Sequence, residues 1–212
     1  MATQLPRQFV IAVALACLAG CAGTTLSENQ CKANDWYTVG YADGSSGFDA
    51  SRLLRHDDAC LGHGVTPDRT QYTAGWNAGI QQYCTPENGF DLGARGALYS
   101  RICPVDLENE FHAAYSNGHT LFVAASEVNQ VESAIEQRSA RIEQMQHEMQ
   151  YAVDALIAPD TTTTDRLFLL ERTKSLSEEQ GRLQAEIERL TADAAVKRAH
   201  LESLRQTLAY AY

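Results

Sequence analysis

Two long stretches in the second half of the chain carry apolar residues at alternating intervals of three and four. One runs from Val128 to Leu156 and the other from Leu169 to Leu208, with the spacing of the a and d positions of a coiled coil. The segment 158–165 between them contains a proline and four threonines, which end one helix and cap the next. Two long helices with so short a connector become antiparallel neighbours. Residues 123–212 are therefore predicted to form an antiparallel coiled-coil hairpin that turns near 158–165.

Polar residues interrupt both apolar stripes. They are Arg138 in the first stripe and Thr173, Gln180 and Lys197 in the second. Such residues either set the register of the hairpin or indicate that helices of a second chain complete the bundle. A homo-oligomer is therefore possible.

Residues 31–122 have a different composition, rich in glycine and aromatic residues, and contain an internal repeat. The pattern aromatic, two residues, small, aromatic, two residues, glycine starts at Tyr37, Tyr72 and Phe111, and a degenerate fourth copy is assigned to 90–96. On a helix the small residue and the glycine share one face and let another backbone approach closely. We expect a globular domain of short helices. A β-rich domain is the alternative, because tyrosine and glycine also suit hairpins, but strict alternation is missing.

The N-terminal residues have the pattern of an export signal. After Arg7, a short apolar run over 9–16 leads into Leu18-Ala19-Gly20-Cys21, which resembles the lipobox of bacterial lipoproteins. Residues 1–20 are predicted to be a signal peptide, Cys21 the lipidated first residue of the mature chain, and 21–30 a tether. Ala22 after the cysteine fits sorting to the outer membrane, facing the periplasm. We expect a lipid-anchored protein of the bacterial cell envelope.

The charge of the chain limits its partners. A net charge of −10 argues against binding nucleic acid or an anionic membrane surface through charge. Attachment to the membrane is therefore assigned to the acyl chains on Cys21.

Four cysteines remain in the predicted globular domain: Cys31, Cys60, Cys84 and Cys103. An even number in an exported chain indicates disulfides, and three pairings are possible. We favour Cys31–Cys60 with Cys84–Cys103, because each closes a local loop. The alternative is a zinc ion held by all four thiolates, but the close CxxC pairs typical of such sites are missing.

Several short motifs together resemble a known family. They include Asp35-Trp36, Gly40-Tyr41-Ala42-Asp43-Gly44, His56 before Cys60, Tyr72-Thr73-Ala74-Gly75-Trp76-Asn77-Ala78-Gly79, Tyr83-Cys84, Asn88-Gly89 and Cys103-Pro104. This combination is similar to an uncharacterised family of proteobacterial envelope lipoproteins (domain of unknown function 2799), over residues 31 to about 119. The resemblance implies an exported lipoprotein and implies no activity.

The candidate catalytic groups are sparse. Asp43, Asp49 and His63 are polar candidates, and Arg55-His56-Asp57-Asp58 places an imidazole beside two carboxylates, a pattern that could bind a metal or share a proton. Adjacent positions point in different directions, however, so these side chains are not expected to converge. No serine-hydrolase, zinc-protease or phosphate-loop motif is present. We therefore predict no catalytic residue, no metal and no cofactor, and a protein that is not an enzyme.

Three functions remain in consideration. The leading hypothesis is a mainly α-helical envelope lipoprotein, with a disulfide-stapled globular domain near the membrane and a hairpin that docks a protein partner. The second is a module that binds cell-wall glycan on exposed rings of Trp36, Tyr41, Trp76 and Tyr115. The third, a hydrolase that uses His56 and Asp57, is least favoured.

Overall fold

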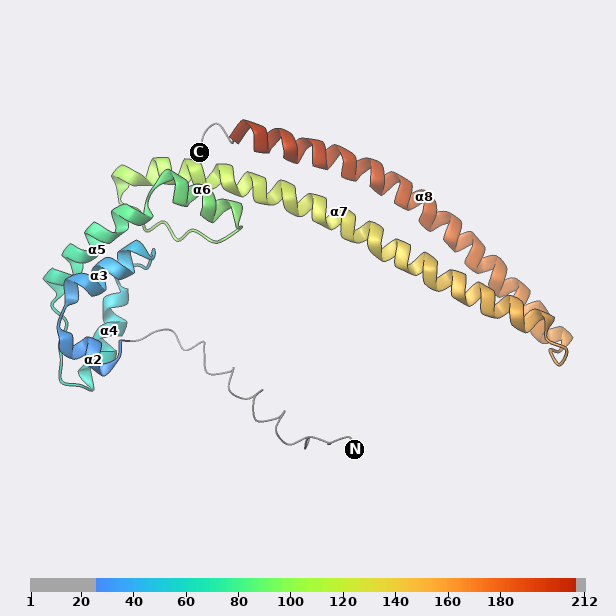
Figure 1. Ribbon diagram of the computed structural model, residues 1–212, viewed down its shortest axis with the longest axis horizontal. Coiled ribbons are helices and arrows are strands. Elements are labelled where there is room, and N and C mark those ends of the chain that lie inside the picture. Colours follow the sequence, from blue (N-terminus) through green and yellow to red (C-terminus); the bar gives the residue numbers. More distant parts are fainter. Residues whose placement is uncertain (1–25, 209–212) are drawn as a thin grey trace, which may run out of the picture. The chain divides into compact units, whose positions relative to one another are not determined.

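The computed structural model describes residues 26–208 and is helical, without a strand in that range. The predicted signal peptide and the predicted lipidation site, Cys21, lie outside the described residues. The helices are α2 (Glu28–Ala33), α3 (Trp36–Ser45), α4 (Arg52–Leu61), α5 (Arg69–Tyr83), α6 (Pro86–Ala94), α7 (Val105–Ile157) and α8 (Thr163–Leu208) (Figure 1). The mainly α fold class is confirmed and the β-rich alternative is wrong. None of the described helices combines the length and the apolar character needed to cross a bilayer.

The chain divides into two compact units. The first contains the described residues through Thr85 together with Arg101–Leu107, and the second contains Pro86–Ser100 and the residues from Glu108 onward. These units do not coincide with the regions 31–122 and 123–212 seen in the composition. The reason is that α7 continues without a break from Val105 to Ile157, so the third copy of the repeat forms the first turns of a hairpin helix.

The first unit is held together by a small core and two disulfides. Aspartates cap its two central helices: the Asp35 carboxylate accepts from the Thr38 amide, and the Asp68 carboxylate accepts from the Thr70 and Gln71 amides. The core residues are Cys31, Trp36, Leu53, Cys60 and Tyr72. The disulfides join Cys31 to Cys60 and Cys84 to Cys103, the favoured pairing. The zinc alternative is therefore wrong.

Helices α3 and α5 pack with their backbones in direct contact. A Cβ atom added at Gly40 would lie 2.1 Å from the Tyr72 carbonyl oxygen, and one at Gly75 would lie 2.0 Å from that of Tyr37. One turn on, Gly44 and Gly79 make the same close approach to backbone atoms of the opposite helix. Each helix thus presents two glycines to the other, as the repeat predicted.

Helix α6 packs in the same way on the first turns of α7, within the second unit. A Cβ atom at Gly93 would lie 2.1 Å from the Tyr115 carbonyl oxygen, and one at Gly118 would lie 2.0 Å from that of Phe90. Gly89 approaches the backbone of the same helix, and Ala114, fully buried, takes the place of the fourth glycine. The first and second units therefore contain the same glycine-packed helix pair.

The two pairs are also alike in the turn that follows the first helix of each, α3 or α6. Gly47 has φ +75° and lies under the ring of Tyr83, and Gly96 has φ +67° and lies under the ring of Phe122. A polar hydrogen also closes each turn. Trp76 Nε1 donates to the Phe48 carbonyl at 2.8 Å. Tyr115 Oη donates to the Ala97 carbonyl at 3.0 Å.

These matches correct the alignment of the fourth copy of the repeat. The sequence placed Phe90 and Gly93 at the first aromatic and the small position of the pattern. In the structure Gly89 corresponds to Gly40 and Gly93 to Gly44, one helical turn away from that alignment. The error arose because the two glycines and not the aromatic residues define the contact.

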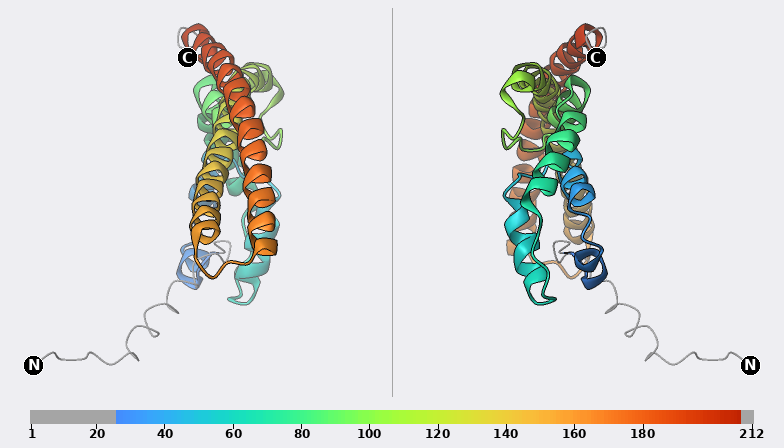
Figure 2. Two further views of the ribbon diagram at one scale, coloured as in Figure 1. Left: turned by 90° about the vertical axis from the view of Figure 1, so that its right-hand side faces the viewer. Right: turned by 90° about the vertical axis from the view of Figure 1, so that its left-hand side faces the viewer.

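Helices α7 and α8 lie side by side and antiparallel, joined by a short loop, in both views of Figure 2. Buried residues at the predicted stripe positions form the seam, including Val128, Met145, Ala152, Leu176, Ala194 and Leu201. Ion pairs also join the two helices, since Arg138 meets Glu186 at 2.8 Å and Lys197 meets Glu127 at 2.9 Å. Thr173 donates to the Leu169 carbonyl of its own helix. Three of the four polar stripe residues thus have partners within the chain.

Candidate functional site

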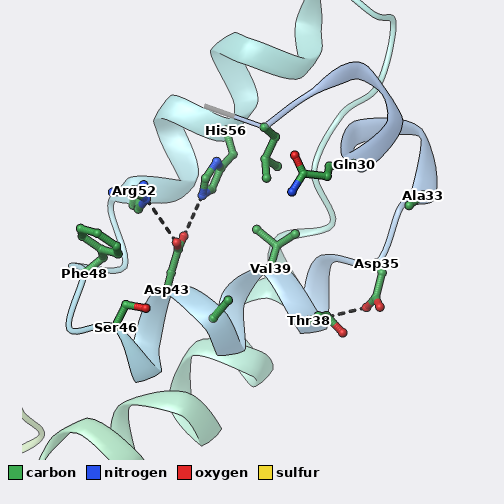
Figure 3. Close-up of a pocket in the computed structure, with 12 residues that line it drawn as sticks. Gln30, Ala33, Asp35, Thr38, Val39, Asp43, Ser46, Phe48, Arg52 and His56 are labelled. Carbon is green, nitrogen blue, oxygen red and sulfur yellow. Dashed lines mark hydrogen bonds and ion pairs between the residues drawn. The ribbon is translucent and has the colours of Figure 1, made fainter. Parts of the chain in front are cut away.

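A buried carboxylate lies at the centre of the first unit. Asp43, on α3 between the two contact glycines, is 7% exposed. Its Oδ2 atom lies 2.7 Å from His56 Nε2 and accepts a hydrogen bond from the Tyr72 hydroxyl at 2.7 Å. Its Oδ1 atom lies 3.2 Å from Nε of Arg52. Figure 3 shows Arg52 and His56 converging on Asp43. Below, the polar cluster means these four residues.

Three helices position the polar cluster. Arg52 and His56 are four residues apart on α4 and therefore share one face of that helix. The Cys31–Cys60 disulfide holds α4 one turn beyond His56. Tyr72 is the first aromatic residue of the repeat on α5, so the glycine contact that joins α3 to α5 also brings its hydroxyl to Asp43.

The cluster keeps Asp43 ionised. Burial by itself would raise the pKa of this carboxyl, but the hydrogen bonds from His56 and Tyr72, together with the charge of Arg52, outweigh it and lower the pKa of Asp43. Burial raises the pKa of Tyr72, and the hydrogen bond that its hydroxyl donates to Asp43 raises it further. Because an ionised carboxylate only accepts hydrogen bonds, the proton between Asp43 and His56 lies on Nε2.

The other ring nitrogen of His56 is not used within the cluster. Nδ1 is buried and has no hydrogen-bond partner among residues 26–208. A histidine nitrogen that is free of hydrogen-bond partners is the atom through which the ring could act as a base or a metal ligand. Here Nδ1 is shut off from solvent, and the described part of the chain contains no group of three metal-ligating side chains that could hold an ion.

A cavity of about 580 Å³ adjoins the cluster. Its walls are largely apolar, with Leu26, Val39 and Ala42 among them, and Asp43, Arg52 and His56 form a polar edge (Figure 3). The guanidinium carbon of Arg52 lies 3.7 Å from the centre of the Phe48 ring, a cation–π contact that orients this side chain. The cavity has the size and the mixed lining of a small-molecule site.

The structure joins two of the predicted polar candidates and separates the others. Asp43 and His56 meet although thirteen residues separate them in sequence. Asp57 is half-buried, and Asp58 is exposed. His56 and Asp57 were not expected to converge, because neighbouring residues on a helix point about 100° apart, and His56 instead contacts Asp43.

The sequence did not identify Arg52 or Tyr72 as members of this site. The sequence does contain a hint of the role of Arg52, which precedes His56 by one helical turn and so shares a helix face with it. It also contains a hint for Tyr72, because the equivalent position of the second pair is Phe111, which has no hydroxyl.

The four aromatic residues proposed to bind glycan do not form an exposed platform. Trp36 is 1% exposed and belongs to the core of the first unit, where its Nε1 donates to the Asn34 side chain at 2.7 Å. Trp76 and Tyr115 are half-buried, and each uses its polar hydrogen to close a turn. Tyr41, at 40% exposed, is the most accessible of the four. The prediction that Trp36 offers a ring face is wrong, because its indole fills the space between the helices.

Comparisons with known proteins give one match. Residues 35–120 match a family model described as protein of unknown function (DUF2799). A search of the curated proteins finds no match. A search of the solved structures finds none either. The matched segment covers both glycine-packed helix pairs. It ends within α7, before the part of that helix that packs against α8.

Proposed function

We propose that this chain, whose residues 35–120 carry the DUF2799 domain, is a non-enzymatic envelope lipoprotein whose α7–α8 hairpin docks a protein partner. On this proposal the acylated Cys21 anchors the chain to the bacterial outer membrane. The domain in the first half holds the tether, and the hairpin supplies reach within the periplasm.

Two features support export and anchoring. The lipobox-like Leu18-Ala19-Gly20-Cys21 follows a short apolar run, as in lipoprotein leaders. All four cysteines among residues 26–208 are paired in disulfides, which persist in oxidising compartments such as the periplasm.

The observation that carries the docking role is the length of the hairpin beyond its core. The apolar cluster of Ala124, Val128 and Leu201 lies about 20 residues into α7, where the end of α8 packs against it. Beyond it, no other described element of the second unit lies beside the two helices, and they pack on each other to the loop (Figures 1 and 2). The 30 residues of α7 from Val128 to Ile157 span about 45 Å. A helix pair of this length is more than the globular core requires, and an arm that reaches a partner accounts for it.

The polar cluster also fits a protein without catalytic activity. Its carboxylate is occupied by His56, Tyr72 and Arg52, and the remaining nitrogen of His56 is buried. No described nucleophile hydrogen-bonds to this histidine.

In-cell crosslinking from the 158–165 loop tests the docking role, with a photoreactive residue at Thr164. A discrete adduct with another envelope protein is expected. A matched variant lacking 133–146 and 175–188, two heptads from each helix, keeps the loop and shortens the arm, and should lose the adduct. Absence of any adduct from loop and helix positions alike contradicts docking. Mass spectrometry of the native protein tests the anchor, since an intact leader would rule it out.

A second candidate function is the binding of a small ligand in the cavity beside the polar cluster. It is favoured by the comparison between the helix pairs, because Leu92 and Phe111 replace Asp43 and Tyr72 in the second pair without loss of packing. The packing of a glycine pair therefore does not require the polar cluster. Thermal-shift measurements with soluble cell-wall glycan fragments test this function, with Val39→Trp, which fills the cavity, as the control.

A further inference from the structure

The loop end of the hairpin exposes an unusual number of large apolar side chains. Those most exposed are Tyr151 at 77%, Ile157 at 75%, Phe168 at 71%, Leu167 at 65%, Leu170 at 53% and Val153 at 42%. All six lie within about three turns of the loop. We call this set the tip patch. Clustered apolar exposure of this kind marks interaction sites in soluble domains.

The spacing of these residues places some of them next to each other on one face of a helix. Val153 and Ile157, four residues apart, share a face of α7, and Leu167 and Leu170, three apart, share a face of α8. The seam between the helices is filled by other residues, including Ala152 and Leu176. The tip patch is therefore additional to the residues that the hairpin needs for its own packing.

Acidic residues outnumber basic ones around the tip patch, and the neighbouring Arg172 is ion-paired with Glu148 at 2.7 Å. Between Gln150 and Glu171 the sequence has Asp154, Asp160, Asp165 and Glu171, all exposed, and Arg166 as the one basic residue. The Arg166 guanidinium donates to the carbonyls of Leu156, Ala158 and Thr161 at 2.6, 2.9 and 3.2 Å. Its donors are thus directed at the end of α7, and the surface offered to a partner is apolar with an acidic rim.

We propose that the tip patch is the docking surface of the arm, and that its occupant is a protein with an apolar recess bordered by lysine or arginine side chains. This inference rests on the proposed docking role and adds the surface and the partner's chemistry. A second copy of this chain would bring two acidic rims together, and anionic lipid headgroups would repel the same carboxylates. A basic rim on another protein complements them and speeds association.

The test places a photoreactive phenylalanine analogue at Phe168 in the full chain in cells. The same analogue at Val196, which is 69% exposed on α8 but remote from the loop in sequence, is the matched control. We expect an adduct with another protein from position 168 and not from 196. Ile157→Asp, combined with the analogue at 168, should lower the yield at least tenfold, whereas Val196→Asp should leave it unchanged. Circular dichroism verifies that both variants keep their helices.

Binding measurements with the purified captured protein then distinguish the possible outcomes. Its affinity for the full chain should fall at least tenfold with Leu167→Asp and fall with added salt. The double variant Asp154→Asn and Asp160→Asn should bind more weakly and with less salt dependence. Binding that is insensitive to salt, a chain-to-itself adduct, or binding of the wild type to phosphatidylglycerol vesicles that Leu167→Asp abolishes overturns the inference. An adduct confined to position 196 overturns this surface but leaves docking standing, and no adduct anywhere removes both.

Discussion

The α3–α5 pair of the first unit and the α6–α7 pair of the second unit pack through the same glycine contact but bury different side chains. Both bring backbones together through glycines four residues apart, and both close the next turn with a glycine at positive φ under an aromatic ring. The first pair places Asp43 and Tyr72 at its centre, where the second has Leu92 and Phe111. The glycine contact is therefore the shared scaffold, and the buried polar residues are an addition to one of its two copies.

The pairs also differ in how they are held. Both disulfides belong to the first unit, and residues 86–100 and 108–212 contain no cysteine. The second pair instead continues into α7, whose length gives it a further helix to pack against in α8. A covalent link and a long helical seam thus serve the same purpose in the two units.

Reduction of the disulfides should have the largest effect and should separate the two units. Loops of 29 and 19 residues contribute about 3–4 kcal/mol each to the free energy of unfolding through loss of chain entropy in the unfolded state. We expect reduced protein to lose amide-exchange protection across α3, α4 and α5, and to keep it across the α7–α8 seam. Hydrogen exchange read by mass spectrometry measures this. Equal loss in both units would show that they fold as one.

Alanine at a contact glycine should affect both pairs alike. In Gly75→Ala or Gly118→Ala the new methyl group meets a backbone carbonyl at 2.0 Å, and a backbone has little room to shift. We expect a loss of about 3 kcal/mol in each case. The control is Gly181→Ala on α8, where the new methyl group meets nothing within 4 Å beyond the adjacent backbone of its own helix, and stability should rise by about 0.5–1 kcal/mol. Urea unfolding compares them, and a mild effect at either contact glycine would refute the shared scaffold.

Asp43→Asn should destabilise the first unit by about 2–3 kcal/mol, since the groups that face this carboxylate lose a charged acceptor. The pH dependence follows from the lowered pKa of Asp43. The stabilisation is complete above the unfolded carboxyl pKa of 3.8 and is lost as the pH falls through the lower, folded value. Wild type should therefore lose stability below about pH 4 more steeply than the variant. Unfolding curves from neutral to acidic pH measure the difference, and parallel profiles would contradict it.

Tyr72→Phe should have the smallest effect, about 1 kcal/mol, because it removes one hydrogen bond and leaves the ring in place. The variant makes this position like Phe111 of the second pair. Tyr151→Phe, at a side chain 77% exposed, is the matched control and should change nothing. Thermal unfolding distinguishes the two. A loss several times larger at Tyr72 would show that the first pair depends on its polar centre.

Local periodicity explains what the sequence predicts well. The alternation of three and four apolar intervals from Val128 onward located both hairpin helices, and the proline and threonines located the turn. The repeat identified the contact glycines because their spacing is a property of one helix. The disulfides followed from short loop closure between Cys31 and Cys60 and between Cys84 and Cys103.

Contacts between distant segments could not be predicted in this way. His56 and Asp57 are neighbours in the sequence, yet His56 contacts Asp43 and Tyr72, because α4 and α5 are placed by a disulfide and by glycine packing. Tryptophan is common both in binding sites and in protein cores. The helices that pack around Trp36 bury it, and the sequence alone does not show that packing. The break between units at Thr85 was hidden for a related reason, since the third repeat copy lies inside a helix that continues into the hairpin.

The Arg166 side chain gives the loop end of the arm a property that four threonines and a proline would not by themselves suggest. Three backbone oxygens from the end of one helix and the following loop are gathered by a single guanidinium at the start of the next. The loop is thereby ordered within the free chain, so binding of a partner at this end, as proposed above, would cost little conformational entropy. The loop at the end of this hairpin is therefore a preorganised surface.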